Sequence, residues 1–180
     1  QGIVGVAPIR EADLDAVLSR AGFLVVLDGV SDPGNAGTII RTADAAGADA
    51  VLFLQGSVDP YNPKAVRAST GSIFHLPVIT GLLAGDLDRV PATGLQLLAA
   101  DVHASVPLDS VDLSVPTALV FGGEAAGLSS GAITACSVSV HIPIARPTRP
   151  GYFGHAESLN LAAAVAVMAY SVNRAQSAPT

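Results

Sequence analysis

The residues best placed to contact a ligand follow an apolar run near the start of the chain. The run, Phe23–Leu27, is typical of a buried strand, and the next stretch, Val30–Gly37, is dense in turn formers and contains Asn35. Helical spacing of apolar residues follows, with Arg41 off the apolar face. In open α/β sheets such a unit puts its loop at the carboxyl edge, where ligands bind. The pattern equally fits a plain turn in which Asn35 caps the helix and Arg41 is solvated.

A second glycine-rich segment directly follows another apolar run, Thr117–Phe121. Because Gly122, Gly123 and Gly127 lack a Cβ, their backbone N–H and C=O groups can approach a flat ligand such as adenine. The alternative is a tight turn that leads into a serine-capped helix. Beside the other motifs we favour ligand contact.

A third segment ends in Glu-Ser-Leu-Asn and precedes a helix that is apolar on nearly every side. Ser158 stands where the N-cap is expected, and the helix is predicted to run to about Arg174. A helix of this kind must be buried all round, and a small monomer rarely buries a terminal helix completely. We therefore expect a homodimer built largely on Leu159–Val172, with burial inside one chain as the alternative.

Taken together, three motifs resemble the SpoU (TrmH-like) family of RNA 2′-O-ribose methyltransferases, in the SPOUT class. The motifs are Asn-x-Gly-x-x-x-Arg at Asn35–Arg41, Gly-x-Glu-x-x-Gly-Leu at Gly122–Leu128, and Ile-Pro-Ile…Glu-Ser-Leu-Asn within His141–Asn160. The resemblance runs in order from about Phe23 to Tyr170. It implies S-adenosylmethionine as the methyl donor and a ribose 2′-hydroxyl of RNA as the acceptor, with ribosomal RNA favoured over transfer RNA.

The apolar runs predict an α/β fold, with a mostly parallel sheet flanked by helices. The resemblance adds a C-terminal deep trefoil knot around residues 122–160. It also divides the chain into residues 1–22, a lead-in and helix that would follow a missing RNA-binding domain, the methyltransferase domain at 23–175, and a tail at 176–180. The expected strands are Phe23–Leu27, Ala50–Leu54, His75–Ile79, Leu95–Ala100, Thr117–Phe121 and Val138–Ile142. Helices are expected from Glu11 or Asp13, from Pro63 and at Leu82–Val90, with an exposed connection at Val106–Val115.

The resemblance also implies site residues. The positions that match the family's polar catalytic residues, with Glu124 shaping the loop, are Asn35, Arg41, Glu124, Ser158 and Asn160. The positions expected to hold the cofactor, mainly through backbone, are Gly122, Gly123, Gly127, Ile142 and Leu159. No metal is expected.

Arg41 would act as a fixed cation, because a guanidinium stays protonated in proteins and cannot serve as a general base. It would bind the neighbouring phosphate and stabilise the developing alkoxide. Asn35 and Ser158 would orient the hydroxyl for attack on the methyl group.

The negative net charge of the chain conflicts with an RNA substrate. The formal net charge is −6, whereas phosphate contacts need Lys and Arg. A local basic patch on an acidic body resolves the conflict, and so does a basic domain outside this chain. The basic residues in or beside the site loops, which are our candidate RNA contacts together with Arg41, are Lys64, Arg67, Arg146 and Arg149. Lys64, Arg67 and Ser69 are expected to share a polar helix face.

The linker Ile144–Glu157 is longer than is usual in the family. Its Arg, Tyr and Phe residues suit an unpaired RNA strand, and equally a stiff loop that folds over the site. A non-catalytic knotted module that binds RNA or an adenosine compound is the alternative function. The complete set of catalytic positions favours the enzyme.

Composition favours a cytoplasmic protein. The longest uninterrupted apolar run, Leu161–Tyr170, is too short to cross a bilayer, and no signal segment is recognisable. A single cysteine, Cys136, excludes an intrachain disulfide and suits a reducing compartment.

Overall fold

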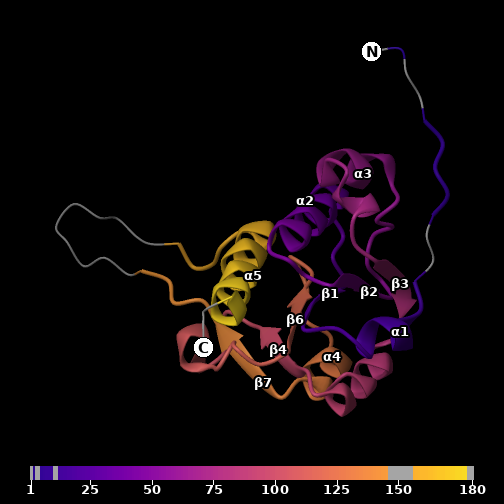
Figure 1. Cartoon of the computed structure of the whole chain (residues 1–180). Helices are drawn as coiled ribbons and strands as arrows, with labels where there is room; N and C mark the ends of the chain where they lie inside the picture. Colours follow the sequence, from indigo (N-terminus) through magenta and orange to yellow (C-terminus); the bar gives the residue numbers. More distant parts are fainter. Residues whose placement is uncertain (1, 3–4, 10–11, 146–155, 178–180) are drawn as a thin grey trace, which may run out of the picture.

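A parallel sheet runs through the centre of the chain in the computed structural model, which describes residues 2, 5–9, 12–145 and 156–177 (Figure 1). Its seven strands have the order β3-β2-β1-β6-β4-β7-β5, and every neighbouring pair is parallel. The predicted α/β fold is confirmed. The strands are β1 Phe23–Asp28, β2 Ala50–Leu54, β3 Val78–Leu82, β4 Gln96–Ala100, β5 Val106–Pro107, β6 Thr117–Gly122 and β7 Val138–His141.

Helices cover both faces of the sheet (Figure 1). Successive side chains of β1 point to opposite faces: Val25 and Leu27 share a buried cluster with α2 and α5, whereas Leu24 and Val26 share one with α1 and α4. Burial on both faces explains why the strands are continuously apolar. The α-helices are α1 Leu14–Leu18, α2 Pro33–Ala45, α3 Pro63–Ser69, α4 Ser130–Ala135 and α5 Leu161–Ser177. Short 3-10 helices lie at η1 Ser72–Phe74, η2 Ala84–Arg89, η3 Pro91–Thr93 and η4 Leu108–Ser110.

The pair β1–β6 marks a switch point of the sheet. The chain leaves β1 for α2 on one face and leaves β6 for α4 on the other, so the loops after the two strands diverge. Divergent loops open a crevice at the carboxyl edge of such a sheet. The first two sequence motifs follow these two strands.

The start of α2 differs from our expectation. We predicted an irregular loop to Gly37, but the helix begins at Pro33 and Asp32 is its N-cap, accepting a hydrogen bond from Asn35 N at 2.8 Å. Proline is well suited to the first helical position because its missing N–H has no partner there. The interpretation in which Asn35 is the cap is therefore wrong, and its side chain is available for another contact.

The start and end of α5 also differ. Asn160, not Ser158, caps the helix: its Oδ1 accepts from Ala162 N at 2.9 Å. The helix continues to Ser177, past the expected end at Arg174, and Gln176 donates to Gly22 O at 3.2 Å. This contact ties the end of the helix to the residue before β1.

Four smaller expectations were wrong. β3 starts at Val78 rather than His75, and the helix expected at Leu82–Val90 is the 3-10 helix η2. The connection Val106–Val115 contains the edge strand β5 and two buried leucines. Ser69 is buried rather than on a polar face of α3.

A carboxylate on α2 makes folding stability depend on pH. Burial alone would raise the pKa of Asp44, but hydrogen bonds from Ser72 and His75 outweigh it and hold the pKa below its usual 3.8. His75 Nδ1 lies 2.8 Å from Asp44 Oδ2. The contribution to stability is therefore present above pH 3.8 and is lost as the pH falls through the lowered pKa.

We expect Asp44→Asn to lower the melting temperature at pH 7, with a deficit that shrinks as the pH falls below 4. Thermal unfolding followed by circular dichroism between pH 7 and pH 3 measures this. Asp88→Asn, at an exposed position of η2, is the control and should melt like the wild type. A deficit that stays constant with pH would contradict the assignment.

Candidate functional site

Backbone packing at the switch point requires two of the motif glycines. A Cβ on Gly123 would lie 2.2 Å from Gly29 O, after β1, and a Cβ on Gly122 would lie 2.1 Å from the carbonyl carbon of Gly127. Both distances are far below any real contact. Gly123 therefore lets the loops after β1 and β6 pack against each other, and Gly122 lets the loop after β6 fold back on itself. The sequence alone did not provide this reason.

Hydrogen bonds fix the rest of this glycine-rich loop. Gly127 N donates to Gly123 O at 2.9 Å, and Gly127 has a φ of 68°, which favours glycine. Ser129 N donates to Asp28 Oδ2 at 2.6 Å, and the Asp28 side chain is buried at the end of β1. Sequence reasoning missed Asp28. Its one signal was an acidic residue at the end of an otherwise apolar strand.

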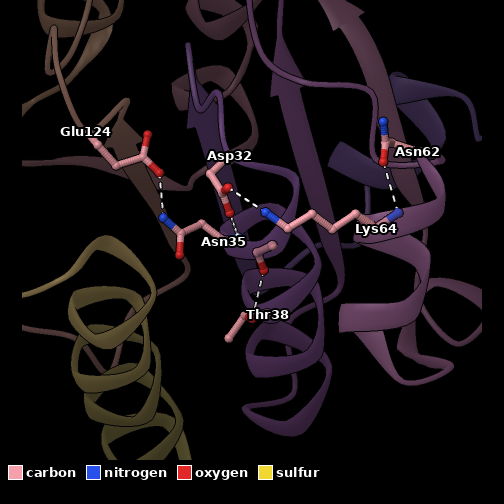
Figure 2. Close-up of polar contacts among 7 residues, drawn as sticks. Asp32, Asn35, Thr38, Asn62, Lys64 and Glu124 are labelled. Carbon is pink, nitrogen blue, oxygen red and sulfur yellow. Dashed lines mark hydrogen bonds and ion pairs between the residues drawn. The ribbon is translucent and has the colours of Figure 1, made fainter.

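Asn35 and Glu124, from the first two motifs, meet across the crevice (Figure 2). Asn35 Nδ2 donates to Glu124 Oε1 at 2.6 Å. An ionised carboxylate only accepts, so Glu124 selects the amide orientation in which Asn35 Oδ1 points elsewhere. The contact joins α2 to the loop after β6.

Lys64 is engaged within the protein (Figure 2). Its Nζ lies 2.9 Å from Asp32 Oδ2, and Lys64 first, then the backbone N–H of Asn35, lowers the pKa of Asp32. Gly37 allows α3 this close approach, because a Cβ there would lie 2.2 Å from Ala65 O. Lys64 thus holds the cap of the helix that carries Asn35.

A cleft of about 710 Å³ opens at the carboxyl ends of β4, β6 and β7, beside the start of α5. It brings together eight of the predicted site residues, and Asn35 reaches it through Glu124. The eight are Gly122, Gly123, Glu124, Gly127, Ile142, Ser158, Leu159 and Asn160.

The predicted basic residues that the structure describes do not line this cleft. Arg41 and Arg67 are exposed on α2 and α3 and do not line the cleft. Among the described residues, Arg41 makes no hydrogen bond or ion pair. Arg146 and Arg149 lie outside the described residues.

The described residues offer little to other chemistries. Burial first, and then the charge of Asp28, raise the pKa of Cys136 to about 12, so the thiol stays protonated and is a poor nucleophile. Within the described ranges no group of three or more His, Cys, Asp or Glu side chains could hold a metal ion. None of the described helices combines the length and the hydropathy needed to cross a bilayer.

A parallel α/β sheet with a glycine loop, an Asn–Glu contact and a cleft at the carboxyl ends of β4, β6 and β7 defines a candidate ligand-binding domain. Residues 22–170 match the SpoU rRNA Methylase family, and the chain belongs to this family.

Two curated relatives are longer than this chain. One is the 23S rRNA (guanosine(2553)-2'-O)-methyltransferase RlmP of Bacillus subtilis (strain 168), 36% identical over 153 residues, which cover 85% of this chain and 58% of that protein. The other is the 23S rRNA (uridine(2479)-2'-O)-methyltransferase of Streptomyces viridochromogenes, 37% identical over 179 residues, which cover 96% of this chain and 60% of that protein.

Two solved structures with bound cofactor are similar. The SpoU methyltransferase AviRb from Streptomyces viridochromogenes in complex with AdoMet gives a TM-score of 0.79 at 36% identity, over 92% of this chain and 65% of that one. The AdoMet-bound rRNA methyltransferase from Sinorhizobium meliloti gives 0.78 at 34% identity, over 92% and 61%.

Proposed function

We propose that this chain is the catalytic domain of an S-adenosylmethionine-dependent methyltransferase that acts on a ribose 2′-hydroxyl of RNA. The observation that carries the proposal is the cleft, which gathers the glycine loop, Ile142 and Leu159 beside the Asn35–Glu124 contact. Ribosomal RNA is favoured because both curated relatives are named as 23S rRNA 2′-O-methyltransferases.

The cleft fits the methyl donor. Its volume of about 710 Å³ lies within the range usual for small-molecule sites, and its wall combines apolar side chains with loop backbone. Gly122, Gly123, Gly127, Ile142 and Leu159 would hold the cofactor. When bound, S-adenosylmethionine supplies an electrophilic methyl group. Two similar proteins solved with AdoMet bound support S-adenosylmethionine as the ligand.

The polar residues beside the cleft would position the acceptor. Because Glu124 takes the Nδ2 donor of Asn35, the Oδ1 of Asn35 is oriented as an acceptor for the ribose hydroxyl. The exposed Ser158 on the cleft wall would hold the same hydroxyl from the other side. Asn160 would act by fixing the start of α5, since its side chain caps that helix.

Arg41 would bind an RNA phosphate and stabilise the alkoxide that develops on the ribose. It is exposed and lies outside the cleft wall, so RNA must bring its phosphate to α2, or a second copy must bring its own Arg41 to this cleft. Arg67 would add a phosphate contact on α3. Lys64 would instead support the Asp32 cap.

A homodimer through α5 completes the proposal. One face of the helix packs on its own chain through Val165, Met168 and Val172, whereas Val167 and Tyr170 are 44% and 46% exposed. A second copy would cover this apolar stripe. Within this chain α5 is therefore not buried on all sides as expected, and the exposed apolar stripe supports the proposed dimer because such patches mark interaction sites.

We expect Val167→Glu to shift the chain from dimer to monomer in sedimentation velocity at micromolar concentration, because it puts a charge into the apolar stripe. Leu83→Glu is the control. Leu83 is also exposed, at 56%, but lies beside η2 on the other side of the sheet, and its variant should stay dimeric. A monomeric wild type would contradict the dimer.

Three further elements belong to this proposal. A knot around residues 122–160 would follow from membership of the SpoU family, whose model matches residues 22–170. A separate RNA-binding domain would supply the basic surface that a chain of net charge −6 lacks. A cytoplasmic location fits an RNA substrate and a protonated single thiol.

Isothermal calorimetry with S-adenosylmethionine tests the proposed methyl donor and, together with methyl transfer to RNA, separates the enzyme from a non-catalytic module that binds RNA or an adenosine compound. We expect one site per chain, with an affinity that a chelator such as EDTA does not change. An absence of binding, or binding lost with EDTA, would overturn the assignment of the cleft.

A further inference from the structure

One buried polar atom remains unexplained by the roles assigned above. In the part of the chain that the structure describes, His141 Nδ1 is the one buried side-chain nitrogen or oxygen without a hydrogen-bond partner. Buried polar atoms normally have partners, and leaving one without a partner costs free energy. An atom of this kind beside a binding cleft points to a missing ligand contact.

The residue that carries this atom lies at the candidate cofactor site. The residue ends β7, directly before Ile142, and lines the large cleft. It also lines an adjoining recess of about 110 Å³, together with Val102, Leu159 and Ala164. His141 thus forms part of the wall shared by the cleft and the recess.

The chemistry of the imidazole decides what kind of partner is missing. A neutral histidine carries its proton on one nitrogen, and a buried N–H without an acceptor is rarer in proteins than a bare acceptor. Nδ1 is therefore the acceptor, with the proton on Nε2. Glu157, which also lines the recess, cannot satisfy it because an ionised carboxylate only accepts.

We propose that His141 Nδ1 accepts a hydrogen bond from the adenosine portion of the methyl donor, from its exocyclic amine or a ribose hydroxyl. This inference rests on the proposed function. The recess wall includes Val102, Ile142 and Leu159, whose apolar side chains offer a packing surface for a flat base. His141 is half-buried, and the soft ring torsion lets Nδ1 turn toward the cleft.

Three substitutions of His141 distinguish the loss of a hydrogen bond from a change in side-chain shape. His141→Asn keeps a polar atom near the place of Nδ1, His141→Gln moves it to the place of Nε2, and His141→Phe keeps a ring without polar atoms. His75→Asn, at an exposed histidine far from the cleft along the sequence, is the matched control. Calorimetry with S-adenosylhomocysteine and with adenosine measures each affinity.

We expect His141→Phe and His141→Gln to weaken both ligands roughly five- to ten-fold, the usual range for one neutral hydrogen bond. His141→Asn should stay within about two-fold of the wild type, and so should His75→Asn. Equal losses for adenosine and for S-adenosylhomocysteine locate the contact on the nucleoside. A loss for S-adenosylhomocysteine alone, or wild-type affinity in His141→Phe, would overturn the inference.

Nitrogen-15 NMR of the imidazole rings tests the same contact in the wild-type chain, so it does not depend on whether a variant folds. We expect the Nδ1 resonance of His141 to move when S-adenosylhomocysteine is added, and the His75 ring to stay unchanged. If the Nδ1 resonance does not shift although the chain binds the ligand, the proposed contact is wrong and the proposed function is unaffected. A wild-type chain that binds neither ligand overturns both.

Discussion

Arg41→Ala is expected to lower methyl transfer by roughly two to three powers of ten, the usual scale for the loss of one charge-stabilising donor. Arg41 makes no hydrogen bond or ion pair among the described residues, so its removal should leave the fold unchanged. Steady-state transfer of labelled methyl groups to ribosomal RNA measures the loss.

Arg41→Lys should keep part of the activity, because the charge survives although the bidentate fork is lost. Cofactor affinity should change little in either variant, since Arg41 lies outside the cleft wall. Arg174→Ala, at the exposed end of α5, is the matched control. Full turnover in Arg41→Ala, or complete loss of cofactor binding, would show that Arg41 has a different role.

Gly122→Ala should abolish cofactor binding and lower the melting temperature. The added Cβ would lie 2.1 Å from the carbonyl carbon of Gly127 and 2.3 Å from Leu128 N, so backbone on one side must move. Overpacking of this kind typically costs about 1–3 kcal/mol. The displaced backbone is the loop that would hold the cofactor.

Gly85→Ala in η2 is the control, since a Cβ there meets nothing within 4 Å. It should bind S-adenosylmethionine and melt like the wild type. Calorimetry and thermal unfolding of the two variants measure the difference. Normal cofactor affinity in Gly122→Ala would show that the loop does not form the site.

The central strands could be predicted because burial on both faces requires continuous apolar runs, as in Phe23–Leu27 and Ala50–Leu54. The edge strand β5 could not, since two residues have no period and Pro107 is one of them. The start of α2 was misplaced because Asp32, Pro33 and Asn35 are all common at helix starts and at turns. Tertiary contacts determine whether such a segment forms a helix start or a turn.

The candidate site was predicted from motif residues, and most of them do line one cleft. The sequence could not show which other residues these side chains contact. Asp28 and Ser129 are 101 residues apart in the chain, and Asn35 and Glu124 are 89 apart. Such pairs depend on how the two halves of the sheet meet. The same is true of His141, whose missing partner is visible only once its neighbours are placed.

Methyl transfer itself tests the proposed function most directly. The chain is incubated with ribosomal RNA and S-adenosylmethionine carrying a labelled methyl group, and the RNA is digested to nucleosides for mass spectrometry. We expect the label in a 2′-O-methylated nucleoside, with roughly two to three powers of ten less label when Arg41→Ala replaces the wild type under the same conditions. Label on a base, or RNA that stays unlabelled although the chain binds both RNA and S-adenosylmethionine, would contradict a ribose 2′-O-methyltransferase.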